Sequence, residues 1–104
     1  MWTILNNAFL SIVENREDSN ELLVRSRVNG DIEKIFPKAN VFQDKLADYK
    51  YRSFINRKEV ASAIYNEIMK IDYDNFKNSV PKTDSERLSA YGDVWSVLLK
   101  LQKY

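Results

Sequence analysis

Apolar residues recur with two different periods along this chain, and the change of period most constrains the fold. In the first half they alternate with polar residues, which is typical of β-strands, and in the second half they recur every three or four residues, which is typical of helices. Residues 8–14 and 22–28 are rich in strand-favouring side chains and flank a polar stretch at 16–20. This arrangement predicts a β-hairpin.

The alternation also assigns side chains to the two faces of each strand. In residues 22–28, one face carries Leu22, Val24, Ser26 and Val28, and the other carries Leu23, Arg25 and Arg27. A further strand is predicted over residues 49–55, with a short one at 41–43. The strand over residues 49–55 carries Tyr49, Tyr51, Ser53 and Ile55 on one face, and Lys50, Arg52 and Phe54 on the other.

Three helices are expected. A short one at residues 31–36 ends before Pro37, which cannot continue a helix. Asn56 has the position of an N-cap for the second helix, and Thr83 opens a third that runs to about Leu101. The apolar stripe of the second helix consists of Val60, Ile64, Ile68 and Ile71. The stripe of the third consists of Leu88, Tyr91, Trp95, Leu98 and Gln102, widened by Val94, Val97 and Leu101. So wide an apolar face predicts deep packing or contact with a partner.

These elements predict an α+β fold: a three- to four-stranded antiparallel sheet with two long helices and one short helix packed on one face. The length of the chain predicts that residues 1–104 form a single α+β domain. The alternative is a largely helical domain with one hairpin.

The composition argues against catalysis. The chain has no His and no Cys, so the commonest general base, the commonest metal ligand and every thiol nucleophile are missing. Its two glycines, Gly30 and Gly92, are too far apart for a phosphate-binding loop. Asp72 and Asp74 resemble a fragment of a cation loop, yet the remaining ligands do not follow, and turn capping explains them better. We therefore predict a protein that is not an enzyme and needs no metal or cofactor.

The binding surface that the pattern favours is basic. Arg25, Arg27, Lys50 and Arg52 are predicted to lie together on the sheet face that the helices leave open, with aromatic residues interleaved. Such a face suits a protein partner or, as an alternative, single-stranded nucleic acid. The simplest alternative is a charged face that only water covers. The net charge of +1 neither demands nor forbids nucleic acid.

Aromatic residues outside the sheet are further candidates, because Trp and Tyr dominate interface hot spots. Tyr73 and Phe76 are assigned to partner binding. Trp2 and Tyr104, near the two ends, suggest a homodimer or partner contact. No segment approaches the roughly 20 apolar residues that span a bilayer. The first residues also lack the pattern of a signal peptide, so a cytoplasmic protein without a membrane partner is expected.

Five short motifs occur in an order that resembles a widespread group of small proteins of bacteria and their phages. They are Ser11-Ile12-Val13, Leu23-Val24-Arg25-Ser26-Arg27, Asp48-Tyr49-Lys50-Tyr51-Arg52, Ile71-Asp72-Tyr73-Asp74-Asn75-Phe76-Lys77 and Tyr91-Gly92-Asp93-Val94-Trp95. The group has no settled activity. Phage carriage implies one specific hypothesis, an anti-CRISPR-like inhibitor that occupies a site on a host protein or protein–nucleic-acid complex in the host cytoplasm. The alternatives are a nucleic-acid-binding module and a small homo-oligomeric accessory protein.

Overall fold

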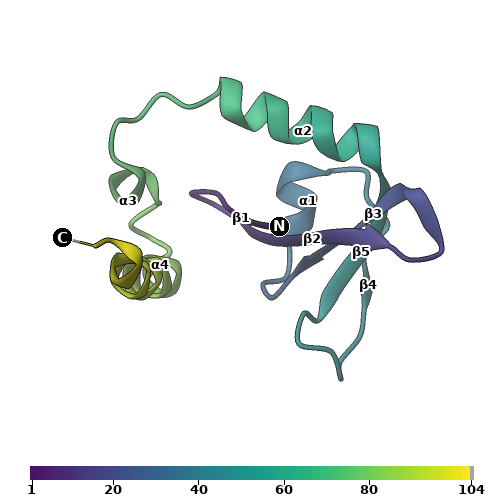
Figure 1. Cartoon of the computed structure of the whole chain (residues 1–104), viewed down its shortest axis with the longest axis horizontal. Helices are drawn as coiled ribbons and strands as arrows, with labels where there is room; N and C mark the ends of the chain where they lie inside the picture. The colour runs from purple at the N-terminus through teal and green to yellow at the C-terminus, as the bar shows by residue number, and fades with distance from the viewer. Residues whose placement is uncertain (104) are drawn as a thin grey trace. The chain divides into compact units, whose positions relative to one another are not determined.

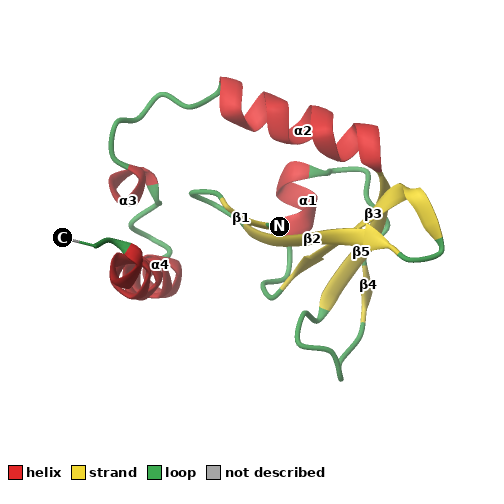
Figure 2. Cartoon of the chain, viewed as in Figure 1, coloured by secondary structure: helices red, strands yellow, loops and turns green. Residues whose placement is uncertain are grey.

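Five antiparallel strands form one sheet in the first part of the chain, followed by helices (Figures 1 and 2). The computed structural model describes residues 1–103. These residues divide into two compact units: unit 1, Met1–Ile71, and unit 2, from Asp72 onward. The mixture of helices with an antiparallel sheet confirms the predicted α+β class.

The strands are arranged in the order β1-β2-β3-β5-β4, and each pairs antiparallel with its neighbour. They are β1 (Trp2–Ile4), β2 (Phe9–Asn15), β3 (Asp18–Ser26), β4 (Phe42–Gln43) and β5 (Tyr51–Asn56). Strand β1 is not among the predicted strands, so the sheet has five strands where three or four were expected. A three-residue strand is too short to show a period, and β1 is identified only by its pairing with β2.

The hairpin of β2 and β3 exists as predicted, but its turn is tighter. Asn15 pairs with Asp18, so only Arg16 and Glu17 connect the strands where a polar loop over 16–20 was expected. The amide of Glu17 donates to Asn15 Oδ1 at 3.0 Å, and the amide of Asn20 donates to Asp18 Oδ1 at 2.9 Å. The end of the hairpin is exposed on both faces, so the strand residues there are polar. Their polar composition is why the sequence predicted a loop at these positions.

Helices α1 (Asp31–Ile35) and α2 (Arg57–Met69) pack on one face of this sheet. Asn56 caps α2 as predicted, accepting from the amide of Lys58 at 2.9 Å. The shared core consists of Leu10, Ile12, Val24, Ile32, Phe36, Ile55 and Val60. Val24 and Ser26 are buried and Leu22 packs against the core, which confirms that face of β3, whereas Val28 lies beyond the strand and is half exposed.

Only the first half of the predicted α2 stripe reaches the core. Val60 is buried, and Ala63 and Ile64 pack against the core cluster. Ile68 and Ile71 are more than half exposed.

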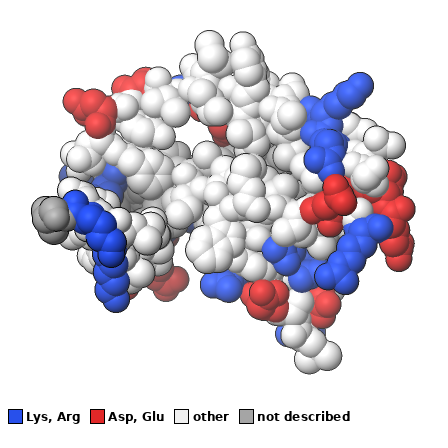
Figure 3. Space-filling view, viewed as in Figure 1, with Lys and Arg blue, Asp and Glu red and all other residues white. Residues whose placement is uncertain are grey.

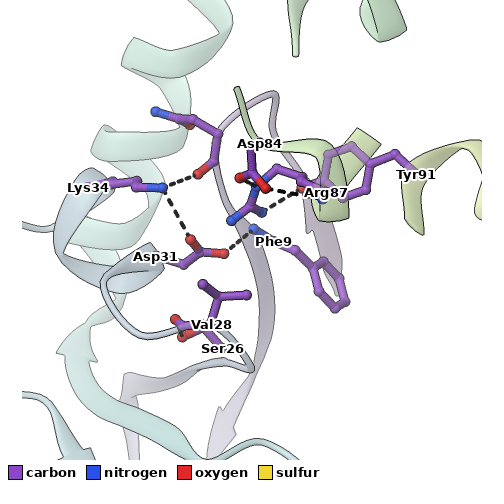
Figure 4. Close-up of polar contacts among 9 residues, drawn as sticks. Phe9, Ser26, Val28, Asp31, Lys34, Asp84, Arg87 and Tyr91 are labelled. Atoms are coloured by element: carbon purple, nitrogen blue, oxygen red, sulfur yellow. Dashed lines mark hydrogen bonds and ion pairs between the residues drawn. The ribbon is translucent and has the colours of Figure 1, made fainter. Parts of the chain in front are cut away.

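A buried carboxylate joins α1 to the sheet within unit 1 (Figure 4). Asp31 is fully buried, and its Oδ2 accepts from the amide of Phe9 at 3.0 Å. Lys34 Nζ lies 3.4 Å from Asp31 Oδ1 and also donates to the carbonyl of Asn7 at 2.8 Å. Buried polar groups need such partners to be tolerated. Asp31 therefore fixes the first turn of α1 against the start of β2.

Unit 2 contains α3 (Phe76–Ser79), α4 (Ser85–Leu98) and the short 3₁₀-helix η1 (Leu99–Leu101). The α4 cap is Asp84, whose Oδ1 accepts from the amide of Arg87 at 3.1 Å. This corrects the expected cap, Thr83, by one residue, because the carboxylate of Asp84 meets the free amide and Thr83 does not.

Whether α4 covers the same sheet face as α2 stays a prediction, and so does the single domain over 1–104. Among residues 1–103, no helix is both long and apolar enough to cross a membrane.

Candidate functional site

The face of the unit 1 sheet opposite α1 and α2 carries a row of side chains that crosses all five strands. Trp2 pairs with Ser11, Ser11 with Arg25, Arg25 with Arg52, and Arg52 with Phe42. Paired residues on adjacent strands point to the same face. We call these five residues the cross-sheet row and the surface around them the open face. An aromatic ring therefore lies at each edge of the sheet, with two guanidinium groups at its centre.

The aromatic ends of the row are exposed. Trp2 is 72% exposed and packs edge-on against Phe9, with ring centroids 6.3 Å apart. Phe42 and Phe54 are 43% and 48% exposed, and their rings stack at 5.7 Å. Rings on a solvated sheet face keep apolar surface in water at a cost that contact with a partner would relieve.

Arg25 lies at the centre of the row and is held mainly by uncharged groups. Its Nη2 donates to the hydroxyl of the buried Ser11 at 2.7 Å. Its guanidinium carbon lies 4.7 Å from the centroid of the Tyr49 ring. Its Nε is buried without a hydrogen-bond partner, and no carboxylate in residues 1–103 forms an ion pair with it.

Arg27 and Arg52 hold the segment that precedes β5. Arg27 Nε donates to the carbonyl of Asp48 at 3.3 Å, and its guanidinium carbon lies 4.6 Å from the Tyr49 ring centroid. Arg52 Nε donates to the carbonyl of Tyr49 at 3.1 Å, and its Nη2 lies 3.8 Å from Asp48 Oδ1. Three of the four predicted cations thus converge on Tyr49, whose electron-rich ring face attracts guanidinium groups.

The remaining predicted cation, Lys50, does not join them. Strand β5 begins at Tyr51, two residues later than expected, so the alternation does not extend to Lys50. Its ammonium lies over the ring of Tyr51, 5.6 Å from the centroid. For the same reason Tyr49 does not share the face of Tyr51. Tyr51 packs against the core cluster, whereas Tyr49 is buried beneath Arg25, Arg27 and Phe9.

The two predicted aromatic contacts, Tyr73 and Phe76, belong to unit 2 and pack within it. Their rings meet edge-on at 6.1 Å, and Phe76 stacks on Tyr91 at 5.8 Å. Arg87, which is buried, donates to Tyr91 Oη at 3.0 Å and to Asp84 Oδ2 at 2.8 Å (Figure 4). Both predicted residues are half-buried in this cluster, and their role in partner binding stays a prediction.

The second half of α4 and η1 expose an apolar surface, which we call the α4 apolar arc. Its members are Val94, Trp95, Val97, Leu98, Leu99 and Leu101, all between 38% and 76% exposed. Lys77 Nζ lies 4.3 Å from the Trp95 ring centroid. Tyr104, the other predicted dimer contact, lies outside the described residues.

Charges of both signs lie on the face of the molecule that Figure 3 shows. In the view of Figure 3, Lys and Arg lie beside Asp and Glu, and neither sign forms a continuous patch. Among residues 1–103, no group of three or more Asp and Glu is arranged to hold a metal ion.

Sequence reasoning missed the aromatic ends of the row. Phe54 was placed on the correct face, but its exposure and its stacking on Phe42 were not expected. Trp2 was considered only as a terminal residue. The sequence did contain a signal for the exposed ring. Phe54 and Arg52 are two residues apart in one strand, so their side chains point to the same face.

No protein-family model matches the chain, nor does any curated protein or solved structure.

Proposed function

We propose that this chain is a non-catalytic binding protein that acts through protein–protein contact, with the open face of unit 1 as its contact surface. The observation that carries the proposal is the cross-sheet row, in which exposed rings flank Arg25 and Arg52. Trp, Tyr and Arg are the residues most enriched at the energetic centres of protein interfaces. A sheet face covered only by water is usually polar, without exposed rings at both edges.

The partner class follows from the sequence resemblance. A host protein or a protein–nucleic-acid complex is the proposed partner, and inhibition of a host defence complex in the manner of an anti-CRISPR protein is the specific form of this function. The absence of His and Cys from the chain supports action by occupation of a site instead of chemistry on it.

Partner capture with matched surface variants tests the proposal. The chain carries its affinity tag at the C-terminus, because the N-terminal amine donates to the carbonyl of Ile12 at 2.7 Å beside Trp2. Trp2→Ala and Phe54→Ala each remove one exposed ring of the open face. Tyr65→Ala is the control, since Tyr65 is a similarly exposed ring (62%) on α2.

A partner recovered in stoichiometric amount by the parent chain and by Tyr65→Ala, but lost with Trp2→Ala and Phe54→Ala, is the expected result. Recovery of no stoichiometric partner argues against the function. Equal recovery by all four proteins argues against the open face as the contact surface.

A second candidate function is self-association as a small homo-oligomeric accessory protein. The α4 apolar arc favours it, because monomeric soluble proteins rarely expose so many large apolar side chains on one short segment. Sedimentation equilibrium over a range of concentrations separates a monomer from a dimer. A strictly monomeric chain at millimolar concentration contradicts this candidate.

A further inference from the structure

A groove opens on the open face beside the cross-sheet row, with a volume of about 390 Å³. Three apolar side chains line it, those of Val13, Leu23 and Phe54. Arg25 and Arg52 line the same groove. Apolar and charged residues therefore meet in one groove, and convergent polar groups of this kind give binding sites their specificity.

The donors of the two arginines are only partly used within the chain. Within residues 1–103, Arg25 donates one side-chain hydrogen bond, to Ser11 Oγ, and its buried Nε has no acceptor. Arg52 donates through Nε to a carbonyl, and its carboxylate contact, to Asp48, is long at 3.8 Å. A buried donor without an acceptor is costly, and an oxyanion that draws the Arg25 guanidinium toward the groove removes that cost.

The rim of the groove limits the kind of anion that fits. Glu14 and Glu17 line it together with Arg16. The lining therefore includes three arginines and two glutamates, and Glu14 is already paired with Arg57 Nη2 at 2.9 Å, so the groove favours an anionic ligand of low charge. A polyanion such as a nucleic-acid strand would bring further phosphates against these two carboxylates, which like-charge repulsion disfavours.

We propose that the groove binds an acidic side chain of a protein partner, next to an apolar residue of the same segment. The carboxylate pairs with Arg25 and Arg52, and the apolar residue packs on Val13, Leu23 and Phe54. This inference rests on the proposed function and specifies which chemistry on the partner the open face recognises. Planar guanidinium groups bind carboxylates through paired hydrogen bonds, which a lysine at either position could not reproduce.

The probe for this proposal is a capped dipeptide, N-acetyl-aspartyl-phenylalanine amide, titrated into the full ¹⁵N-labelled chain. Its uncharged counterpart with asparagine, inorganic phosphate and a short oligothymidine are titrated in parallel. Backbone amides and the Arg Nε–H groups are followed by NMR. Saturable shifts at Leu23, Arg25, Arg52 and Phe54 with the acidic dipeptide are expected, together with at least about tenfold weaker binding of the asparagine form, which corresponds to about 1.4 kcal/mol.

Variants of the chain locate the contact. We expect Arg25→Gln to weaken the acidic dipeptide at least about tenfold, while the control Lys50→Gln stays within about twofold because Lys50 lies outside the groove. If Arg25→Gln loses the dispersed spectrum of a folded chain, Phe54→Ala tests the same groove from an exposed position.

The proposal is overturned by the absence of a saturable shift at the groove, by equal binding of the two dipeptides, or by tighter binding of oligothymidine than of the acidic dipeptide. Phosphate that matches the acidic dipeptide also overturns it, because the apolar residue then contributes nothing. Failure of this inference is distinguishable from failure of the proposed function. If a captured partner is lost with Trp2→Ala but retained by Arg25→Gln, the open face remains the contact surface. The proposed recognition of an acidic side chain is then ruled out.

Discussion

Arg25 of β3 and Arg52 of β5 lie directly opposite each other on neighbouring antiparallel strands, near the middle of an open sheet face. Like charges in this position destabilise a sheet unless other groups compensate for them. Here the compensation comes from the Ser11 hydroxyl, the Tyr49 ring and the Tyr49 carbonyl, with Asp48 at a longer distance. In the described part of the chain, no carboxylate lies closer to this pair than Asp48 at 3.8 Å, which makes the pair the most specific feature of the candidate site.

The contact between Arg25 and Ser11 is expected to contribute to stability. Arg25→Ala should lower the free energy of unfolding by about 2 kcal/mol, because it removes a charge-assisted hydrogen bond to a buried hydroxyl and a cation–π contact. Chemical denaturation measures this value. The double variant with Ser11→Ala should lose about 1 kcal/mol less unfolding free energy than the sum of the two single variants, because the residues are direct partners. Strict additivity would show that the hydrogen bond contributes nothing.

The buried carboxylate of Asp31 is expected to matter more. Asp31→Ala should lower the free energy of unfolding by about 3 kcal/mol, because the amide of Phe9 loses its acceptor inside the protein. Asp31→Asn should cost less, since its amide oxygen can still accept that hydrogen bond. Glu33→Ala, an exposed position on the same helix, is the control and should change stability by less than about 0.5 kcal/mol. Equal effects of Asp31→Ala and Glu33→Ala in thermal and chemical unfolding would contradict the assigned role.

The two glycines are expected to respond to alanine in opposite directions. Gly30 has φ +94°, in the left-handed region that side chains rarely adopt, so Gly30→Ala should destabilise the chain by about 1–2 kcal/mol. Gly92 lies inside α4, and a Cβ there meets no atom within 4 Å, so Gly92→Ala should stabilise it by up to about 1 kcal/mol. The midpoints of denaturant unfolding compare the two. The explanation fails if both substitutions shift the midpoint in the same direction.

The α4 apolar arc is expected to control self-association more than stability. Leu98→Glu replaces a side chain that is 53% exposed and should lower the free energy of unfolding by no more than about 1 kcal/mol. It should also remove any concentration-dependent increase in sedimentation coefficient, because a charge at the contact resists desolvation. Ser96→Glu, on the opposite side of the same helix, is the matched control. Association that persists unchanged in Leu98→Glu would place the contact elsewhere.

The sequence by itself determined the kinds of elements and much of their order. Alternation in residues 22–26 predicted which side of β3 enters the core, and Val24 and Ser26 are buried as expected. The cap at Asn56 and the break at Pro37 were also readable, because these signals depend on a few adjacent residues. The same local rule placed Arg25, Arg27 and Arg52 on the open face, away from the buried Val24 and Ser53.

The tertiary structure alone decided what those cations do. Strand β1 exists through its pairing with β2, and only that pairing brings Trp2 into a row with Arg25. Tyr49 lies two residues before β5, where the alternation no longer holds, so its position beneath two arginines follows from contacts distant in sequence. No hairpin turn joins β3 to β5, so the register between these two strands depends on packing between segments far apart in the sequence. The sequence therefore predicted a basic face, and the register turned it into two opposed arginines between exposed rings.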